Sequence, residues 1–251
     1  MRWLHQSLQS VRAMISRAGY SIYPNTDYFI ADQIALLSGK PDPIVFDVGA
    51  NGGQFARAYR TKLPQARLFC LEPIPHLARG LRQDLPDTEV VELALASSDG
   101  LATFHLNEFE DTSSLLAPDL KRMPESYRSA MRPKRSIEVG TVRLDSLMTQ
   151  YSLEHIDILK MDIQGGEYAA LQGAKECLER EQVSIIALEV FFEAFYCDQP
   201  RFGDIAALLA QNNYRLHRLY NINFSGRSGR PQWADAIFIG PSVAAVDAAI
   251  D

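Results

Sequence analysis

The 251-residue sequence has a formal net charge of −6, with 47% hydrophobic and 22% charged residues. This balance is typical of a globular protein and excludes a disordered or fibrous chain. The length suits one large α/β domain. The acidic charge disfavours non-specific nucleic-acid binding, which depends on Lys and Arg. No apolar run approaches the roughly 18 residues that span a membrane. We therefore expect no nucleic-acid partner and no transmembrane segment.

Three widely spaced cysteines, Cys70, Cys177 and Cys197, indicate neither a disulfide framework nor a zinc site. We expect a reducing, cytoplasmic location and no metal. Residues 3–15 carry apolar side chains at helical spacing beside several arginines. This pattern is typical of a docking helix or a contact in a homo-oligomer, and a membrane-surface helix is the alternative. We expect an N-terminal helical extension (1–40), a main domain (41–240) and a C-terminal tail (241–251).

Short β-rich apolar runs alternate with helical stretches, which predicts a parallel sheet with helices on both faces. The expected strands are 44–48, 67–71, 89–93, 138–144, 156–161, 183–190, 214–219 and 234–239. The expected helices are 53–62, 167–179, 202–211 and one that opens at Pro75.

Three connections in the main domain differ from simple strand–helix turns. Asp99-Gly100 separates two alternating runs and predicts a β-hairpin turn. The polar stretch from about 107 to 137 is too long for a hairpin connection, and long loops in compact domains are often functional. We expect it to form a lid over the site. A second loop, 220–233, is expected to join the last two strands on the same side.

A glycine-rich turn, Asp47 to Gly53, lies where the first strand gives way to a helix. Glycines permit a tight turn and a close approach to a ligand, and the helix N-terminus favours an anion. Of the three positions that a dinucleotide fingerprint requires as glycine, only Gly49 matches, and no P-loop pattern follows. An NAD-dependent oxidoreductase is therefore the less favoured alternative. Glu72 ends the second strand, where α/β nucleotide folds place an acid that binds ribose hydroxyls.

The sequence resembles the FkbM family of class I S-adenosylmethionine-dependent methyltransferases. Five stretches carry the resemblance between residues 44 and 238. They are Phe46-Asp47-Val48-Gly49-Ala50-Asn51-Gly52-Gly53-Gln54-Phe55, Leu71-Glu72-Pro73, Val142-Arg143-Leu144-Asp145-Ser146-Leu147, Ile156 to Glu167 and Trp233 to Phe238. The glycine-rich turn alone is moderately specific, and the turn together with the stretch from Leu159 to Glu167 is much more so, although many members have Glu at the position of Gln164.

The resemblance implies a Rossmann-like fold with a mostly parallel seven-stranded sheet and an inserted β-hairpin. It also implies O-methylation of a sugar, glycan or natural-product hydroxyl, with S-adenosylmethionine as cofactor. Glu72 would bind the ribose, and Ala94 would lie near the adenine. The residues expected to bind the cofactor are Asp47, Gly49, Ala50, Asn51, Gly52, Gln54, Phe55, Glu72, Pro73, Ala94 and Asp162.

Three residues are candidates for catalysis, because an alcohol nucleophile benefits from a group that takes its proton. Asp162 ends a core strand, and ligands bind at the carboxyl ends of parallel strands. It is expected to act as base, to orient the hydroxyl or to position the cofactor, with capping of loop N–H groups as the alternative. Glu189 interrupts an apolar strand and lies in the substrate site or is a satisfied structural acid. His105 is a weaker candidate, with a strand-surface or core position as the alternative.

The expected acceptor-binding residues come from the two loops and from the stretch after Asp162. They are Ser113, Ser114, Arg132, Gln164, Asn223 and Trp233. The lid is locally basic, which predicts either a solvated face or recognition of an anionic acceptor such as a phosphorylated sugar. Trp233 either contacts a sugar or packs against the sheet. A non-catalytic protein that kept the fold remains a further alternative.

Overall fold

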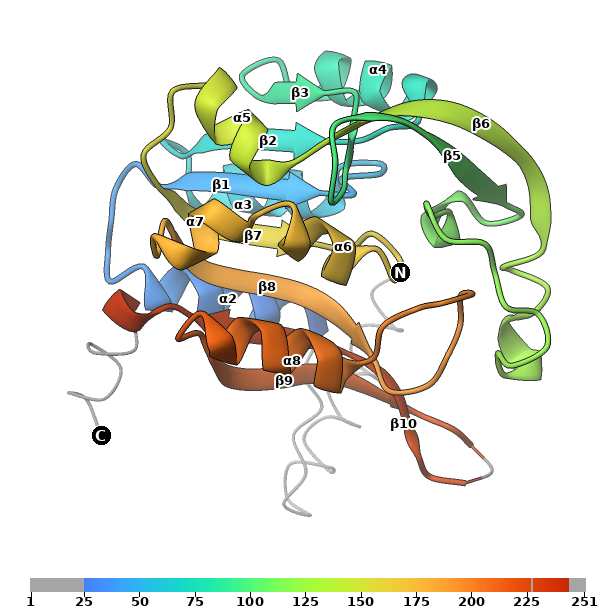
Figure 1. Cartoon of the computed structure of the whole chain (residues 1–251). Helices are drawn as coiled ribbons and strands as arrows, with labels where there is room; N and C mark the ends of the chain where they lie inside the picture. Colours follow the sequence, from blue (N-terminus) through green and yellow to red (C-terminus); the bar gives the residue numbers. More distant parts are fainter. Residues whose placement is uncertain (1–24, 227, 244–251) are drawn as a thin grey trace, which may run out of the picture.

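The computed structural model describes residues 25–226 and 228–243. Its main sheet has seven strands in the order β3-β2-β1-β7-β8-β10-β9 (Figure 1). They are β1 (Ile44–Val48), β2 (Arg67–Leu71), β3 (Glu89–Val91), β7 (Ile156–Met161), β8 (Val183–Phe191), β9 (Arg215–Phe224) and β10 (Pro231–Ile239). All neighbouring strands are parallel except β10, which runs antiparallel to β8 and β9. This order confirms the expected mostly parallel seven-stranded sheet.

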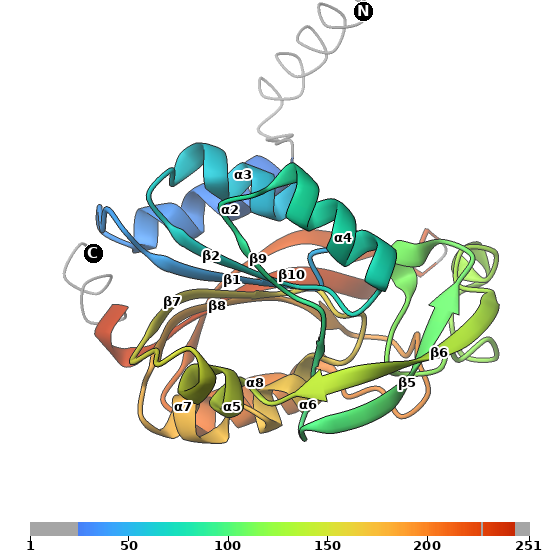
Figure 2. The same ribbon diagram turned by 90° about the horizontal axis from the view of Figure 1, so that it is seen from above.

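Helices cover both faces of this sheet, as the alternation of strands and helices predicts (Figure 2). One face carries α2 (Asn25–Leu36), α3 (Gln54–Lys62) and α4 (Pro75–Asp84). The other carries α5 (Leu144–Gln150), α6 (Glu167–Gln172), α7 (Lys175–Glu179) and α8 (Phe202–Gln211). The result is a three-layer sandwich whose carboxyl-end edge remains free for a site.

Consecutive residues of the central strands point to opposite faces of the sheet and pack in two separate hydrophobic cores. In β1, Val45 packs towards α2 and α3, whereas Phe46 packs with the residues beneath α5 to α8. Ile158 and Leu159 of β7 divide in the same way. Successive strand side chains point to opposite faces, so a strand with both faces covered must be apolar throughout. These nearly continuous apolar runs are the reason that β1 and β7 have the bounds expected from the sequence.

A second sheet of three strands, in the order β4-β6-β5, extends from the carboxyl-end side of the main sheet. It contains β4 (Ala94–Leu95), β5 (Gly100–Asn107) and β6 (Pro133–Val142). β5 and β6 are antiparallel, and the segment 108–132 joins them. This segment is called the lid from here on; the last five residues of the expected 107–137 stretch belong to β6.

The inserted hairpin is present, but the prediction of its turn at Asp99-Gly100 was wrong. β4 pairs in parallel with β6 rather than antiparallel with β5. The Asp99 carboxylate accepts hydrogen bonds from the backbone N–H of Arg143 at 2.7 Å and from the Ser146 hydroxyl at 2.7 Å. Asp99 therefore joins β4 and β5 to the start of α5, a helix that the sequence analysis did not predict.

The helix expected over 167–179 is two helices, α6 and α7, separated at Gly173. A Cβ atom at Gly173 would lie 2.1 Å from the carbonyl oxygen of Ala96. The backbone that follows β4 passes this close, so only glycine is accommodated there. The loop expected over 220–233 is also shorter, because β9 extends to Phe224 and β10 starts at Pro231.

Helix α2 is the described part of the expected N-terminal extension, whereas residues 3–15 lie outside the described residues. Phe29 and Ile30 of α2 are buried. The Phe29 ring contacts Phe55 at a centroid distance of 6.2 Å and Tyr220 at 5.6 Å, both edge-on. Helix α2 thus completes one core. No helix among residues 25–226 and 228–243 is both long and apolar enough to cross a membrane.

Candidate functional site

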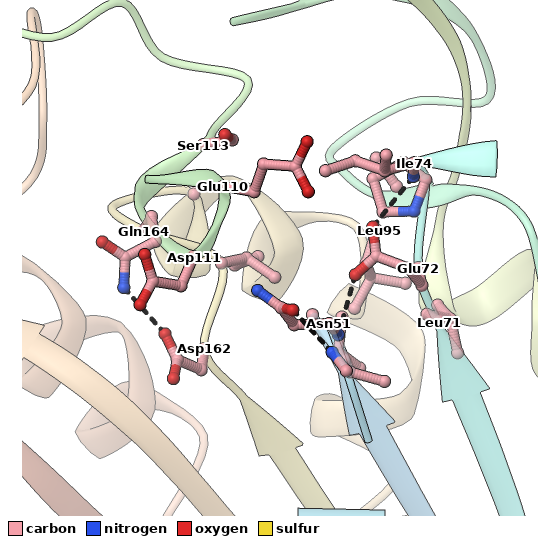
Figure 3. A pocket seen from close by; sticks show the side chains of 18 of the residues that line it. Asn51, Leu71, Glu72, Ile74, Leu95, Glu110, Asp111, Ser113, Asp162 and Gln164 are labelled. Atoms are coloured by element: carbon pink, nitrogen blue, oxygen red, sulfur yellow. Dashed lines mark hydrogen bonds between the residues drawn. The ribbon is translucent and has the colours of Figure 1, made fainter. Parts of the chain in front are cut away.

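A cavity of about 480 Å³ lies at the carboxyl ends of β1, β2 and β7, beneath the lid (Figure 3). Glu72 faces one end of it, and Asp111, Asp162 and Gln164 gather at the other. Ten of the eleven residues expected to bind the cofactor line this cavity. They are Gly49, Ala50, Asn51, Gly52, Gln54, Phe55, Glu72, Pro73, Ala94 and Asp162.

The glycine-rich turn wraps the floor of the cavity. The N–H groups of Gly49 and Ala50 donate to the Leu71 carbonyl at 3.0 and 3.1 Å, and the Asp162 N–H donates to Val48 at 3.0 Å. Gly49 has a φ of 73°, and a Cβ atom there would lie only 2.0 Å from the Asp162 carbonyl oxygen. Glycine is therefore required for β1 and β7 to end side by side.

Glu72 is held by the backbone and is only 4% exposed. One carboxylate oxygen accepts the N–H of Asn51 at 2.8 Å, and the other accepts the N–H of Ile74 at 2.8 Å. Burial raises the pKa of Glu72 to about 7, although these two hydrogen bonds counteract the shift; the nearby Asp47 raises it further. The structure thus fixes an acid rigidly at the end of β2, with lone pairs available for a ligand.

An apolar wall faces the Glu72 end of the cavity. Leu93 lines it just before β4, Ala94 and Leu95 line it from β4, and Phe104 lines it from β5. Ala94 and Leu95 are buried within this wall. A flat apolar group can pack here while its polar substituents reach Glu72, which matches the expected position of Ala94.

Asp47 is the expected cofactor residue that does not line the cavity. It is fully buried, and Nζ of the buried Lys160 lies 2.9 Å from its Oδ1 atom. Lys160 also lies 4.3 Å from the centre of the Phe55 ring. Burial acts to lower the pKa of Lys160, but the charges of Asp47 and Asp162 outweigh it and the net shift is upward. Asp47 therefore supports the glycine-rich turn from the buried side, away from the cavity.

Lys160 lines the cavity, and the sequence analysis did not single it out. A lysine within the largely apolar run of β7 was the available signal, because a buried charge requires a partner. Its partner, Asp47, lies directly opposite on β1. The pair became visible only once the two strands were known to be neighbours.

A polar network closes the other end of the cavity. Nε2 of Gln164 donates to Asp162 Oδ1 and to Glu189 Oε2, both at 2.8 Å, and Oε1 of Gln164 accepts the Tyr196 hydroxyl at 2.8 Å. Burial, followed by the charges of Asp162 and other acids, raises the pKa of Glu189 well above its ordinary value. Glu189 lies behind Gln164 and does not line the cavity.

Glu167 closes the same turn from α6 and is almost completely buried. Its carboxylate accepts the N–H of Ile163 at 2.9 Å. Burial raises its pKa to about 7, although backbone hydrogen bonds oppose the shift. These contacts give Glu167 a structural position in the loop after β7.

The lid supplies Glu110, Asp111 and Ser113 to the cavity. Ser114 lies behind them, and its hydroxyl donates to the Gln164 carbonyl at 2.9 Å. Of the six expected acceptor residues, Ser113 and Gln164 therefore line the cavity. Asp111 and Tyr196 were missed because the polar lid and the segment before α8 carry no distinguishing pattern.

His105 and Arg132 lie away from the cavity. His105 exchanges backbone hydrogen bonds with Ser114, and its ring Nδ1 lies 3.2 Å from the Ser136 hydroxyl. The side chain of Arg132 is 70% exposed and lies 3.4 Å from the Glu108 carboxylate. These positions match the alternatives of a strand-surface histidine and a solvated basic face.

Asn223 and Trp233 lie on β9 and β10 rather than in a loop. The indole N–H of Trp233 donates to the Tyr127 hydroxyl at 3.1 Å, and that hydroxyl donates to Asn223 Oδ1 at 3.1 Å. Both residues hold the lid against the β9–β10 hairpin and do not line the cavity. The ladder between β9 and β10 extends past the expected strand ends, which places them there.

Comparison with known proteins identifies the family of the chain. A model of the methyltransferase FkbM domain matches residues 47–216. The 2-O-methyltransferase NoeI of Sinorhizobium fredii is 32% identical over 164 residues, covering 62% of this chain and 68% of NoeI. Methyltransferase sdnD of Sordaria araneosa is 29% identical over 163 residues, covering 54% of this chain and 61% of sdnD.

A solved structure supports the fold. A candidate sarcosine dimethylglycine methyltransferase from Galdieria sulphuraria superposes with a TM-score of 0.50 and 9% identity, covering 85% of this chain and 84% of the other. At this identity the likeness concerns the fold alone. The family match spans the glycine-rich turn, Glu72 and Asp162 together, and this chain therefore belongs to the FkbM family of S-adenosylmethionine-dependent methyltransferases.

Proposed function

We propose that this methyltransferase transfers the methyl group to a hydroxyl of an uncharged sugar, glycan or sugar-like natural product, with Asp162 as the group that receives the hydroxyl's proton. The observation that carries this proposal is the placement of Asp162. Its Oδ1 is bound to Gln164, whereas its Oδ2 meets no hydrogen-bond donor among the described residues and Asp162 lines the cavity. The name of the 32% identical relative, a 2-O-methyltransferase, supports oxygen as the accepting atom.

The residues around the cavity fit S-adenosylmethionine. The rigid Glu72 carboxylate suits a pair of ribose hydroxyls, and the apolar wall at Ala94 and Leu95 suits an adenine ring. The turn at Gly49, where a Cβ atom has no room, allows a close backbone approach to the methionine part. Three separate parts of the cavity wall thus suit the ribose hydroxyls, the adenine ring and the methionine part of the cofactor.

The cofactor supplies a methyl group already activated on its sulfonium sulfur, so the chain mainly has to align the nucleophile. The free Oδ2 of Asp162 accepts a hydrogen bond from the acceptor hydroxyl and so directs an oxygen lone pair towards the methyl group. As the C–O bond forms and the C–S bond breaks, the hydroxyl proton passes to this carboxylate. The lid covers the site and limits the access of water.

The charge around the acceptor end favours an uncharged acceptor. Three acids, Glu110, Asp111 and Asp162, line the cavity. The two cations that also line it, Arg57 and Lys160, are paired with Asp84 and Asp47, and none of the basic residues of the lid lines it. Carboxylates accept hydrogen bonds from hydroxyls and repel phosphate. This arrangement supports a neutral polyol and favours the solvated basic face over the alternative of an anionic acceptor.

Transfer of labelled methyl groups to a panel of oligosaccharides tests the proposal. Neutral oligosaccharides should be labelled, and a matched acceptor whose hydroxyl is already methylated should not. The 6-phosphorylated form of each active sugar should react at least tenfold more slowly, in line with like-charge repulsion of about 1.4 kcal/mol or more. Labelling of amines alone, or a preference for the phosphorylated sugars, would contradict it.

We also propose that the protein is cytoplasmic and does not bind nucleic acid. Cys70, Cys177 and Cys197 are all unpaired, which supports a reducing compartment. The net charge of −6 gives no support to phosphate-backbone binding. A homo-oligomer formed through residues 3–15 stays a prediction.

Cofactor affinity should depend on pH through Glu72. Because the pKa of Glu72 is raised to about 7, its carboxylate is partly protonated at neutral pH before the cofactor binds. Ribose hydroxyls donate best to the ionised form, so affinity should fall as pH decreases through about 7, approaching tenfold per pH unit. Glu72→Gln should weaken binding about 10- to 100-fold at pH 8 and remove this dependence.

Calorimetric titration with S-adenosylhomocysteine between pH 5.5 and 8.5 measures both effects. The matched control is Glu92→Gln, an exposed acid that pairs with Arg82 outside the cavity. It should behave as the unmodified protein does. Equal pH dependence in the Glu72→Gln variant would assign the titration to another group.

A further inference from the structure

Gln164 occupies an uncommon backbone conformation between β7 and α6. Its φ is 56°, and Gly165 follows at 91°. Residues other than Gly, Asn and Asp rarely adopt a positive φ, because the Cβ atom then crowds the backbone. A glutamine is nevertheless held there by contacts of both its backbone and its side chain. The turn aims the amide at the space between β7 and β8.

The orientation of the Gln164 amide is determined by its partners. Nε2 carries two hydrogens, and Asp162 and Glu189 accept one each at 2.8 Å. Oε1 accepts the Tyr196 hydroxyl at 2.8 Å. The reversed amide would place its oxygen against two acidic side chains, which favours this orientation, with the single Tyr196 hydrogen shared between Gln164 Oε1 and the Thr112 carbonyl. The Gln164 amide is fully used and has no N–H left for an acceptor.

The same residue anchors the lid. The Ser114 hydroxyl donates to the Gln164 carbonyl at 2.9 Å. The Tyr196 hydroxyl lies 2.8 Å from the Thr112 carbonyl as well as from Gln164 Oε1. Tyr196 is almost completely buried and also forms a β-bridge with Pro118 of the lid. The lid therefore contacts Gln164 in two ways. Ser114 binds the main-chain carbonyl of Gln164, and Tyr196 links the lid to its side-chain amide.

The surroundings of Asp162 make the hydrogen bond that it receives from the Gln164 amide important. Acidic groups face it from four of the segments around it, and Lys160 opposes them with a positive charge. These groups are Glu167 on α6, Glu189 on β8, Asp235 on β10, Asp111 on the lid and Lys160 on β7, together with the phenol of Tyr196. Two hydrogen-bond donations from one neutral amide allow Asp162 and Glu189 to approach the same point without direct contact.

We propose that Gln164 is a positioning residue that couples the seating of the lid to the orientation of the Asp162 carboxylate. This inference rests on the proposed function, in which Asp162 receives the hydroxyl's proton. When the lid is seated, Tyr196 fixes Oε1, the amide plane is fixed, and Nε2 holds Oδ1 of Asp162 so that Oδ2 faces the cavity. When the lid lifts, the amide is free to turn and Asp162 loses its alignment.

Two variants test separately the hydrogen bonds that the Gln164 amide donates to the acids and the contact that Tyr196 makes with the lid. Gln164→Glu keeps an oxygen for Tyr196 but removes both donations and adds a third acid. The added charge favours protonation of the acid cluster, so the acidic limb of the kcat profile should move up by about one pH unit. Tyr196→Phe removes the hydroxyl that contacts both the Thr112 carbonyl and Gln164 Oε1 but adds no charge, so it should leave this limb in place and lower kcat/KM about tenfold.

A double-mutant cycle adds the test of coupling. Tyr196→Phe should change kcat/KM in the unmodified protein but have little further effect when combined with Gln164→Leu. Tryptic cleavage after Arg122 and Arg128 of the lid, which needs no acceptor, should accelerate in Tyr196→Phe and in Gln164→Leu, which both lose the contact between Tyr196 and the Gln164 side chain. Urea denaturation of each variant establishes that it is folded. If Gln164→Leu does not fold, Tyr196→Phe and Gln164→Glu still carry the comparison.

The outcomes distinguish this inference from the proposed function. An unchanged pH profile in Gln164→Glu, additive effects in the cycle or unchanged cleavage of the lid would each overturn the coupling, even if sugar methylation is observed. Labelling of amines in place of hydroxyls would instead overturn the proposed function, and the cleavage result would still report on Gln164. A shifted limb, a non-additive cycle and faster cleavage together support the coupling.

Discussion

Replacing Asp162 by asparagine should lower kcat by about 10²- to 10⁴-fold, the usual contribution of a positioned proton acceptor. Asparagine retains an oxygen that accepts the Gln164 N–H, which in the unmodified protein donates to Asp162 Oδ1 at 2.8 Å. The loop after β7 and the lid contacts should therefore remain in place. The loss should appear in kcat, with the affinity for S-adenosylhomocysteine within about threefold of the original, because removing one charge changes ground-state binding little.

Single-turnover transfer of labelled methyl groups measures this loss without interference from product release. The matched control is Glu108→Gln, an acid of the lid that pairs with Arg132 outside the cavity. It should retain full activity. If Asp162→Asn keeps more than about a tenth of kcat, Asp162 positions the hydroxyl or the cofactor and another group, or water, takes the proton.

The second large effect concerns stability. Lys160→Met should lower the free energy of unfolding by about 3–5 kcal/mol, because it leaves a buried charge without its partner. Lys160 is 2% exposed and Asp47 is 0% exposed, and their charged atoms are 2.9 Å apart. Methionine fills a similar volume, so the loss of charge, rather than a cavity, accounts for the change. Urea denaturation at pH 7 measures it.

Two further variants make this result specific. Lys160→Met combined with Asp47→Asn should be more stable than Lys160→Met alone, because no uncompensated charge stays buried. Lys175→Met removes an exposed lysine that lies 3.7 Å from Glu179 and should cost about 0.5 kcal/mol or less. Equal losses for Lys160→Met and Lys175→Met would show that the buried pair contributes nothing of its own.

The pH range of this stabilisation follows from the direction of the Lys160 shift. Burial lowers its pKa, the charges of Asp47 and Asp162 raise it, and the net pKa lies above the ordinary value. A cationic group with a raised pKa in the folded state stabilises fully below its unfolded pKa of about 10.4 and loses this contribution as pH rises through the folded value. The effect of Lys160→Met should therefore be constant near neutral pH.

The local sequence determined the central strands and the glycine-rich turn. The bounds of β1, β2 and β7 are those expected, because each strand is one short, mostly apolar run that ends at a turn signal or at an acid. Gly49 and Glu72 were found for the same reason, since a strand end, a backbone conformation and a buried acid are all local features. These features were sufficient to place the end of the cavity that Gly49 and Glu72 line.

Contacts between distant segments decided the rest. The break between α6 and α7 depends on the Ala96 carbonyl, which lies beside Gly173. The strand that pairs with β4 is β6, which follows the lid in the chain. The acceptor end depends on Gln164, which joins Asp162 to Glu189 and to Tyr196 across three separate segments. No spacing in the chain encodes such a meeting, because the hydrogen bonds that define it form only after the strands and the lid have packed.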